Sequence, residues 1–185
     1  MRGWIIGVYA LLSAGVEHAE GVGEPYAKVG DWEISTEYHR GCAMTRWFAG
    51  SVADDEQLLS IFYDAQRKAA ALGWVTRKPK FPPLSHSLHF ELTFTRKGSS
   101  LNETWGSQPF QIQKRADAYT STHAFNGLTD SDRLLRDLAS HDTIGLWFGP
   151  TLMAGLPLHA SDAVAKLREC SSKIVEHDTS DRLQK

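Results

Sequence analysis

The chain has 185 residues, of which 42% are hydrophobic and 23% are charged, and its formal net charge is −2. This length suits one globular domain, since ordinary domains have about 100–200 residues. The small negative charge argues against a nucleic-acid-binding protein, because such proteins carry a strongly basic surface. We therefore expect no nucleic-acid partner.

The N-terminal segment has the pattern of an export signal. Arg2 is followed by an apolar run over residues 4–12 and then by small residues at positions 13–15. A charged start, a short apolar core and a small-residue exit are typical of a signal peptide, which we place at residues 1–19. The run is too short to predict a stable membrane span, and a short buried first helix is the alternative interpretation. Export would place the chain in the periplasm or outside the cell, where the environment is oxidising.

The first two thirds of the chain have the pattern of a β-rich domain. Residues 20–28 contain glycines and a proline and are interpreted as a loose leader. After them, apolar and polar side chains alternate with the period of two that is typical of strands. The predicted strands cover residues 31–39, 42–48, 58–63, 72–76 and 88–95, with shorter ones at Trp105 and at 110–112.

The last third combines two helices with two strands. The spacing of apolar residues predicts a helix over residues 130–141, and Thr129 with Asp132 resembles a capping box at its start. Residues 144–148 and 152–158 alternate again and predict two strands, of which the second contains Pro157 and suits a sheet edge. A second helix is predicted over residues 161–174.

This order of elements predicts an α+β fold that is mainly β. Strands follow one another without intervening helices, so we expect an antiparallel β-sandwich or a strongly bent sheet, with two helices packed on one side or at one end. One β-rich domain is expected to span residues 20–175. The polar residues 176–185 are expected to form a flexible tail.

The chain contains two cysteines, Cys42 and Cys170. Cys170 belongs to the apolar arc of the predicted last helix, which spans roughly 120° at about 100° per residue, so it faces the core. In an oxidising compartment two cysteines are expected to pair, and we predict a disulfide that encloses most of the domain. Two buried, unpaired thiols are the alternative.

Five short segments carry a resemblance to a known family. They are residues 30–34 (GDWEI), 41–44 (GCAM), 134–139 (LLRDLA), 153–156 (MAGL) and 163–170 (AVAKLREC). In this order they resemble the invasion-associated locus B proteins and their uncharacterised relatives, which are small exported proteins of Gram-negative bacteria. The resemblance implies a periplasmic or secreted β-rich domain that is closed by a disulfide.

The sequence identifies no catalytic, cofactor-binding or metal-binding residue, and we expect no cofactor. His86 and His89 are three positions apart, and in a strand such side chains face opposite sides, so they do not converge on one metal ion unless the proline-rich segment before them bends. No Gly-x-Ser-x-Gly motif marks a nucleophile. A Ser–His–Asp site assembled from distant residues remains an alternative.

Three tryptophans are the candidate interface residues. Trp47, Trp105 and Trp147 each fall on the opposite phase from the apolar face of their strand. Exposed tryptophan often anchors a protein interface, whereas a second buried face of the sheet is the alternative explanation. We predict an exported, non-enzymatic binding or interaction protein, with an inhibitor, immunity-type or host-contact role. Its partner would be another protein in the cell envelope or outside the cell, and a small exported hydrolase is the alternative function.

Overall fold

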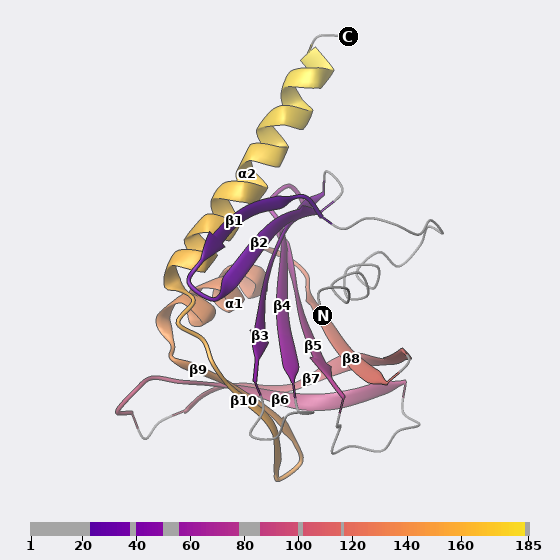
Figure 1. Ribbon diagram of the computed structural model, residues 1–185, viewed down its shortest axis with the longest axis vertical. Helices are drawn as coiled ribbons and strands as arrows, with labels where there is room; N and C mark the ends of the chain where they lie inside the picture. Colours follow the sequence, from indigo (N-terminus) through magenta and orange to yellow (C-terminus); the bar gives the residue numbers. More distant parts are fainter. Residues whose placement is uncertain are drawn as a thin grey trace.

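The computed structural model describes residues 23–37, 40–49, 56–77, 86–99, 102–115 and 117–183, so the predicted signal peptide at 1–19 lies outside the described residues. Figure 1 shows how the strands and the two helices are arranged. The strands are β1 (Pro25–Val29), β2 (Trp32–Glu37), β3 (Gly41–Phe48), β4 (Gln57–Asp64), β5 (Ala69–Thr76), β6 (Ser87–Thr95), β7 (Asn102–Arg115), β8 (Ala118–Phe125), β9 (Thr143–Phe148) and β10 (Thr151–Pro157). The helices are α1 (Leu128–Ser140) and α2 (Ser161–Leu183).

All ten described strands belong to one antiparallel sheet, which confirms the predicted fold class. Their order is β1-β2-β3-β4-β5-β8-β7-β6-β9-β10. Neighbouring strands are joined mostly by hairpins, as the alternating pattern predicted for β2 with β3 and for β4 with β5. The strand β10, which contains Pro157, lies at the edge of the sheet. An edge strand tolerates proline because it has a neighbouring strand on one side only.

The sheet bends so strongly that its two ends approach each other. The indole N–H of Trp32 on β2 donates to the carbonyl oxygen of Leu158, directly after β10, at 3.1 Å. The guanidinium of Arg46 on β3 donates to the carbonyl oxygens of Pro157 and Leu158 at 3.1 and 2.9 Å. Because β2 and β10 stand near opposite ends of the strand order, these bonds require a strongly curved sheet. Figure 1 shows β3, β4 and β5 running across the direction of β6 and β7.

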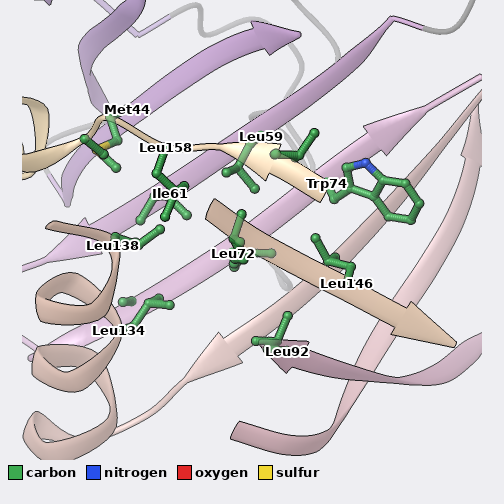
Figure 2. Packing of buried hydrophobic residues seen from close by; sticks show 14 of the residues in the cluster. Met44, Leu59, Ile61, Leu72, Trp74, Leu92, Leu134, Leu138, Leu146 and Leu158 are labelled. Carbon is green, nitrogen blue, oxygen red and sulfur yellow. The ribbon is translucent and has the colours of Figure 1, made fainter. Parts of the chain in front are cut away.

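The concave side of the sheet encloses one apolar core. Figure 2 shows how strand residues such as Ile61, Leu72 and Leu92 meet Leu134 and Leu138 of α1. All five of these side chains are fully buried. The helix α1 packs beside β5, whereas α2 packs on β1, β2, β3 and β4. The apolar residues of α1 recur with a period of about 3.6 residues, which predicted the helix from the sequence, because one side of the helix packs on the core.

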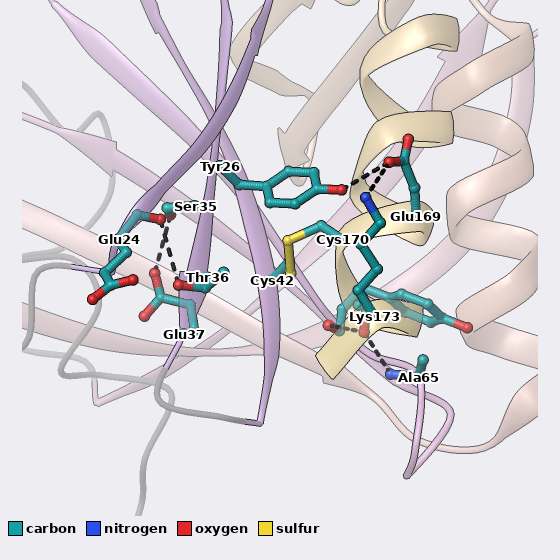
Figure 3. The surroundings of a disulfide bond; sticks show 12 residues. Glu24, Tyr26, Ser35, Thr36, Glu37, Cys42, Ala65, Glu169, Cys170 and Lys173 are labelled. Atoms are coloured by element: carbon teal, nitrogen blue, oxygen red, sulfur yellow. Dashed lines mark hydrogen bonds and ion pairs between the residues drawn. A yellow bond between two sulfur atoms is a disulfide. The ribbon is translucent and has the colours of Figure 1, made fainter. Parts of the chain in front are cut away.

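A disulfide joins Cys42 of β3 to Cys170 of α2, as predicted (Figure 3). Both cysteines are buried, and 128 positions separate them in the chain. One residue further on, the Ser171 hydroxyl donates to the carbonyl of Tyr63 at 3.1 Å and accepts from the N–H of Ala65 at 2.9 Å. The disulfide and these hydrogen bonds fix α2 against the first half of the sheet.

Three strands differ from the prediction. The interpretation of residues 20–28 as a loose leader is wrong for β1, which pairs with β2 and packs Tyr26 against the core. The strand β8 was missed because its core-facing positions include the polar residues Ser121 and His123, which interrupt the apolar alternation. The strand β7 continues through Pro109 instead of consisting of two short strands. Pro109 pairs with His89 of β6, whereas the pairing of β7 with β8 covers only Gln111 to Arg115, so the proline lies where β7 has a strand on one side.

Both helices have different ends from those predicted. The capping box at Thr129 and Asp132 is wrong, because α1 begins at Leu128 with Gly127 at its N-cap and no side-chain capping bond. The φ angle of Gly127 is 92°, a conformation that favours glycine. The helix α2 runs to Leu183, beyond the predicted end at 174, and so extends into the segment expected to be a tail.

Candidate functional site

A bulge in β7 determines where Trp105 points. Opposite Leu92 of β6, the strand β7 has two residues, Trp105 and Gly106, between the pairs Thr93–Thr104 and Glu91–Ser107. Gly106 has a φ angle of 66°, as the glycine of such a bulge requires. The extra residue shifts the phase of the strand, so Trp105 packs against the core although its sequence position suggested the outer face.

The Trp105 side chain contacts both helix α1 and the neighbouring aromatic residues. Its indole N–H donates to Asp137 Oδ2 at 2.8 Å, and the ring centroid of Phe125 lies 5.1 Å away in an edge-to-face arrangement. The guanidinium carbon of Arg133 lies 4.3 Å above the indole ring, in a cation–π contact. Arg133 Nε also lies 3.6 Å from Asp137 Oδ2. Trp105 is therefore held on its edge and on one face.

A pocket of about 340 Å³ lies beside these side chains, between β7, β8 and the start of α1. We call it the Trp105 pocket. It combines aromatic surface with a cation, a carboxylate and neutral polar groups, and the residues that line it include Trp105, Gln108, His123, Phe125, Asp130 and Arg133. Such a mixture of aromatic walls with a few polar groups is common in binding sites.

His123 supplies a neutral polar group to this pocket. Burial lowers the pKa of the His123 imidazole below its usual value, against the opposing effects of its bond to the Pro109 carbonyl and of Asp130. The ring Nδ1 lies 2.7 Å from the Pro109 carbonyl oxygen. Because a carbonyl only accepts, Nδ1 carries the proton and Nε2 is left as an acceptor.

Behind Trp105, three ionisable residues meet at the end of α1. They are Glu103 of β7, Asp137 of α1 and His141, the C-cap residue of α1, and we call them the His141 cluster. One nitrogen or oxygen atom from each lies within 4.8 Å of the others. Asp137 and His141 are buried, whereas Glu103 is exposed. None of the three is a candidate site residue from the sequence pattern.

The contacts of His141 argue against a hydrolase site here. Ser140 Oγ lies 3.1 Å from His141 Nδ1, which superficially resembles a nucleophile beside its base. However, Nδ1 lies 2.9 Å from the carbonyl oxygen of Asp137 and must carry a proton to bond to it. A nitrogen that already carries a proton is unable to accept one from Ser140.

The other two tryptophans lie apart from the Trp105 pocket. Trp147 is half-buried on the outer face of β9, where its indole N–H donates to Thr93 at 3.0 Å. Leu152 of β10 is its cross-strand neighbour and is 41% exposed. Trp47 of β3 is the most exposed of the three, at 47%. The three tryptophans are thus not brought together into one surface.

His86 and His89 are both exposed, and His89 pairs with Pro109 in the sheet. In the described part of the chain, the His141 cluster is the group of three residues that could hold a metal ion, and it contains neither of these histidines. Within the residues described, neither helix is long and apolar enough to cross a membrane.

Comparison with known proteins gives no relative from which a function can be transferred. No family model, no curated protein and no solved structure matches the chain. The function must therefore be argued from the site itself.

Proposed function

We propose that the chain is an exported, non-enzymatic binding protein that docks a protein partner in the cell envelope or outside the cell. The observation that carries this proposal is the Trp105 pocket, with its aromatic walls and the guanidinium of Arg133 stacked on Trp105. Tryptophan and arginine are enriched among the residues that dominate the binding energy of protein interfaces.

The size of the pocket favours one anchor side chain from a partner. Its volume of about 340 Å³ is at the lower end of the range of about 300–1,000 Å³ for pockets that hold small molecules. An apolar or aromatic side chain would lie against the partly exposed Trp105, while polar groups beside it would bond to Gln108 or His123.

An exposed apolar residue extends this surface. Leu128, the first residue of α1, is 48% exposed and lies in the chain between Asn126 and Asp130, both of which line the pocket. Full burial of a leucine contributes about 1.5–3 kcal/mol, and burying the exposed half of Leu128 against a partner therefore contributes on the order of 1 kcal/mol. The binding surface would therefore consist of the Trp105 pocket and Leu128.

The N-terminal pattern and the disulfide both support export. Arg2 and the apolar run over residues 4–12 are typical of a signal peptide, and the Cys42–Cys170 bond suits an oxidising compartment. The resemblance to the invasion-associated locus B proteins supports the same location.

Site-specific photo-crosslinking in cells tests the proposal. A photoreactive amino acid at Leu128 should capture a partner, whereas the same amino acid at Leu152, which is 41% exposed on the distant strand β10, should not. The partner is then identified by mass spectrometry, and the recovered protein should lack residues 1–19. Equal capture from both positions, or from neither, contradicts a binding surface at the pocket.

The affinity of the purified partner provides the quantitative test. Leu128→Ala should weaken binding by about 5–30-fold, since an anchor residue contributes about 1–2 kcal/mol or more. The matched variant Leu152→Ala should leave the affinity unchanged, because it removes a similarly exposed leucine from the other surface. If Leu152→Ala weakens binding and Leu128→Ala does not, the interface lies at Trp147 and Leu152 instead.

A further inference from the structure

His141 has a buried ring nitrogen with no hydrogen-bond partner. The side chain of His141 is only 2% exposed, and its Nε2 makes no hydrogen bond of acceptable geometry. Burying a polar atom without a partner costs about 1–3 kcal/mol, so such an atom requires an explanation. The nearest charged atom to Nε2 among the contacts of His141 is Glu103 Oε1, at 3.2 Å.

The rest of the ring is fixed, so the orientation of Nε2 is built into the fold. The carbonyl oxygen of Asp137 lies 2.9 Å from Nδ1, and the Phe94 ring packs on the imidazole with a centroid distance of 5.7 Å. A bond from Nδ1–H to a backbone carbonyl is the usual arrangement for a histidine that binds a metal ion through Nε2. In the neutral ring, Nε2 then carries a free lone pair, 3.2 Å from the carboxylate oxygen Oε1 of Glu103.

We propose that Glu103, Asp137 and His141 form a binding site for Zn²⁺ or a similar divalent metal ion. In a neutral His141, two electron-rich atoms lie 3.2 Å apart, and a cation bound to both removes their repulsion. Ligand atoms at about 2.0–2.2 Å from a tetrahedral zinc ion lie about 3.3–3.5 Å apart. The observed separation of Nε2 and Oε1 is close to that distance.

The third ligand comes from the same helix turn. Asp137 and His141 are four positions apart, so they lie on one face of the end of α1. The indole N–H of Trp105 donates to Asp137 Oδ2 and orients the carboxylate, as outer-shell donors do around metal ligands. One carboxylate oxygen of Asp137 is then the third ligand atom. One imidazole and two carboxylates leave a fourth position for water, in a donor set that suits zinc.

The arginines around the cluster limit the affinity. Arg133 and Arg136 lie 3.6 and 3.9 Å from oxygens of Asp137, and Arg96 lies 3.7 Å from Glu103. These cations partly neutralise the two carboxylates and compete with a metal ion for them. We therefore expect a dissociation constant in the range of about 1–100 μM, weaker than that of a structural zinc site.

Cobalt absorption of the full-length, oxidised protein tests the site. Co²⁺ substitutes for Zn²⁺ and should give visible absorption bands that zinc abolishes by competition. Glu103→Gln should weaken cobalt binding by at least about tenfold. The matched control is Glu33→Gln, which removes an exposed carboxylate from β2 and should leave binding unchanged. Because both glutamates are exposed, neither variant should alter the fold, and circular dichroism checks this.

The nitrogen resonances of the histidine rings provide an independent readout. Addition of Zn²⁺ should shift the Nε2 resonance of His141 and leave its Nδ1–H bond in place. The inference is overturned if no cobalt bands appear at about 1 mM metal, which is roughly tenfold above the weakest expected dissociation constant. It is also overturned if Glu103→Gln binds cobalt as well as the parent protein, or if Nε2 carries a proton that metal does not displace. These outcomes leave the binding surface at Leu128 untested, so the two proposals fail separately.

Discussion

Removal of the disulfide should cost this fold a large part of its stability. The bond between Cys42 and Cys170 closes a loop of 128 positions. In the chain-entropy model, a loop of that length restricts the unfolded chain by about 5 kcal/mol at 25 °C. Measured losses for small secreted domains are about 2–5 kcal/mol, against a total stability of about 5–15 kcal/mol.

Cys42→Ser and Cys170→Ser should each lower the free energy of unfolding by this amount, and the double variant by no more than either single one. The losses are not additive because one bond is removed in every case. We expect weakened folding without its complete loss, since Ala163, Val164 and Leu167 of α2 remain buried against the sheet. A loss of about 5 kcal/mol corresponds to a fall of about 10–20 °C in Tm for a protein of this size.

Chemical denaturation with and without reductant measures the effect. Reductant should destabilise the parent protein as much as either cysteine variant and should leave the variants unaffected. Ser171→Ala is the matched control, because it removes the bonds to Tyr63 and Ala65 from the next position of α2 and keeps the disulfide. This control should cost about 1 kcal/mol and stay sensitive to reductant. A parent protein with two titratable thiols and an unchanged midpoint in reductant would refute the reasoning.

Two further predictions concern stability. Burial raises the pKa of Glu37 to about 7 from 4.5, so the folded state retains a proton that the unfolded state releases, and stability falls as pH rises from about 4.5 to above 7. Glu37→Gln should make the denaturation midpoint less dependent on pH and should raise the free energy of unfolding at pH 8 by roughly 1–3 kcal/mol. If the midpoint depends on pH as steeply in the variant as in the parent protein, Glu37 is not the group responsible. A Cβ at Gly145 would lie 2.5 Å from Thr93 Oγ1 and 2.9 Å from Trp147 Nε1, so Gly145→Ala should displace the indole and cost about 1–3 kcal/mol. Gly155→Ala is its control, because the nearest side-chain atom would lie at an ordinary 3.5 Å; equal losses in the two variants would show that the indole position is not the cause.

The fold class was predictable because most core strands have unmistakable patterns. In β6, the core residues Leu88, Phe90, Leu92 and Phe94 alternate with polar ones, and burial follows the alternation from Ser87 to Leu92. The buried arc of α2 similarly placed Cys170 on the side that meets Cys42. In these elements, one local period determines which face is buried.

The site was not predictable, because it depends on irregular and non-local features. The bulge at Gly106 reverses the phase of Trp105, and a single glycine in a strand does not reveal such a shift. Glu103 and His141 are 38 positions apart and meet through the pairing of β7 with β6 and the contact of His141 with Phe94. The four-residue spacing of Asp137 and His141 at the end of the predicted helix was the one local indication of a metal site. It points to such a site only when the fold places Glu103 beside the two residues.

The hydrogen bond between Trp105 and Asp137 makes the pocket and the His141 cluster parts of one structure. Trp105 forms a wall of the pocket with one part of its indole, and its N–H fixes a carboxylate of the cluster with another. Arg133 contacts both, since it stacks on Trp105 and lies 3.6 Å from Asp137. A metal ion bound to Asp137 would weaken the electrostatic attraction between that carboxylate and Arg133. The guanidinium of Arg133, which faces a partner in the pocket, would then be held less tightly. By thermodynamic linkage, a partner whose affinity changes on metal binding must change the affinity for the metal by the same factor. The bulge at Gly106 therefore bears on both proposals, because the shift that it makes in β7 places Trp105 between the pocket and the His141 cluster.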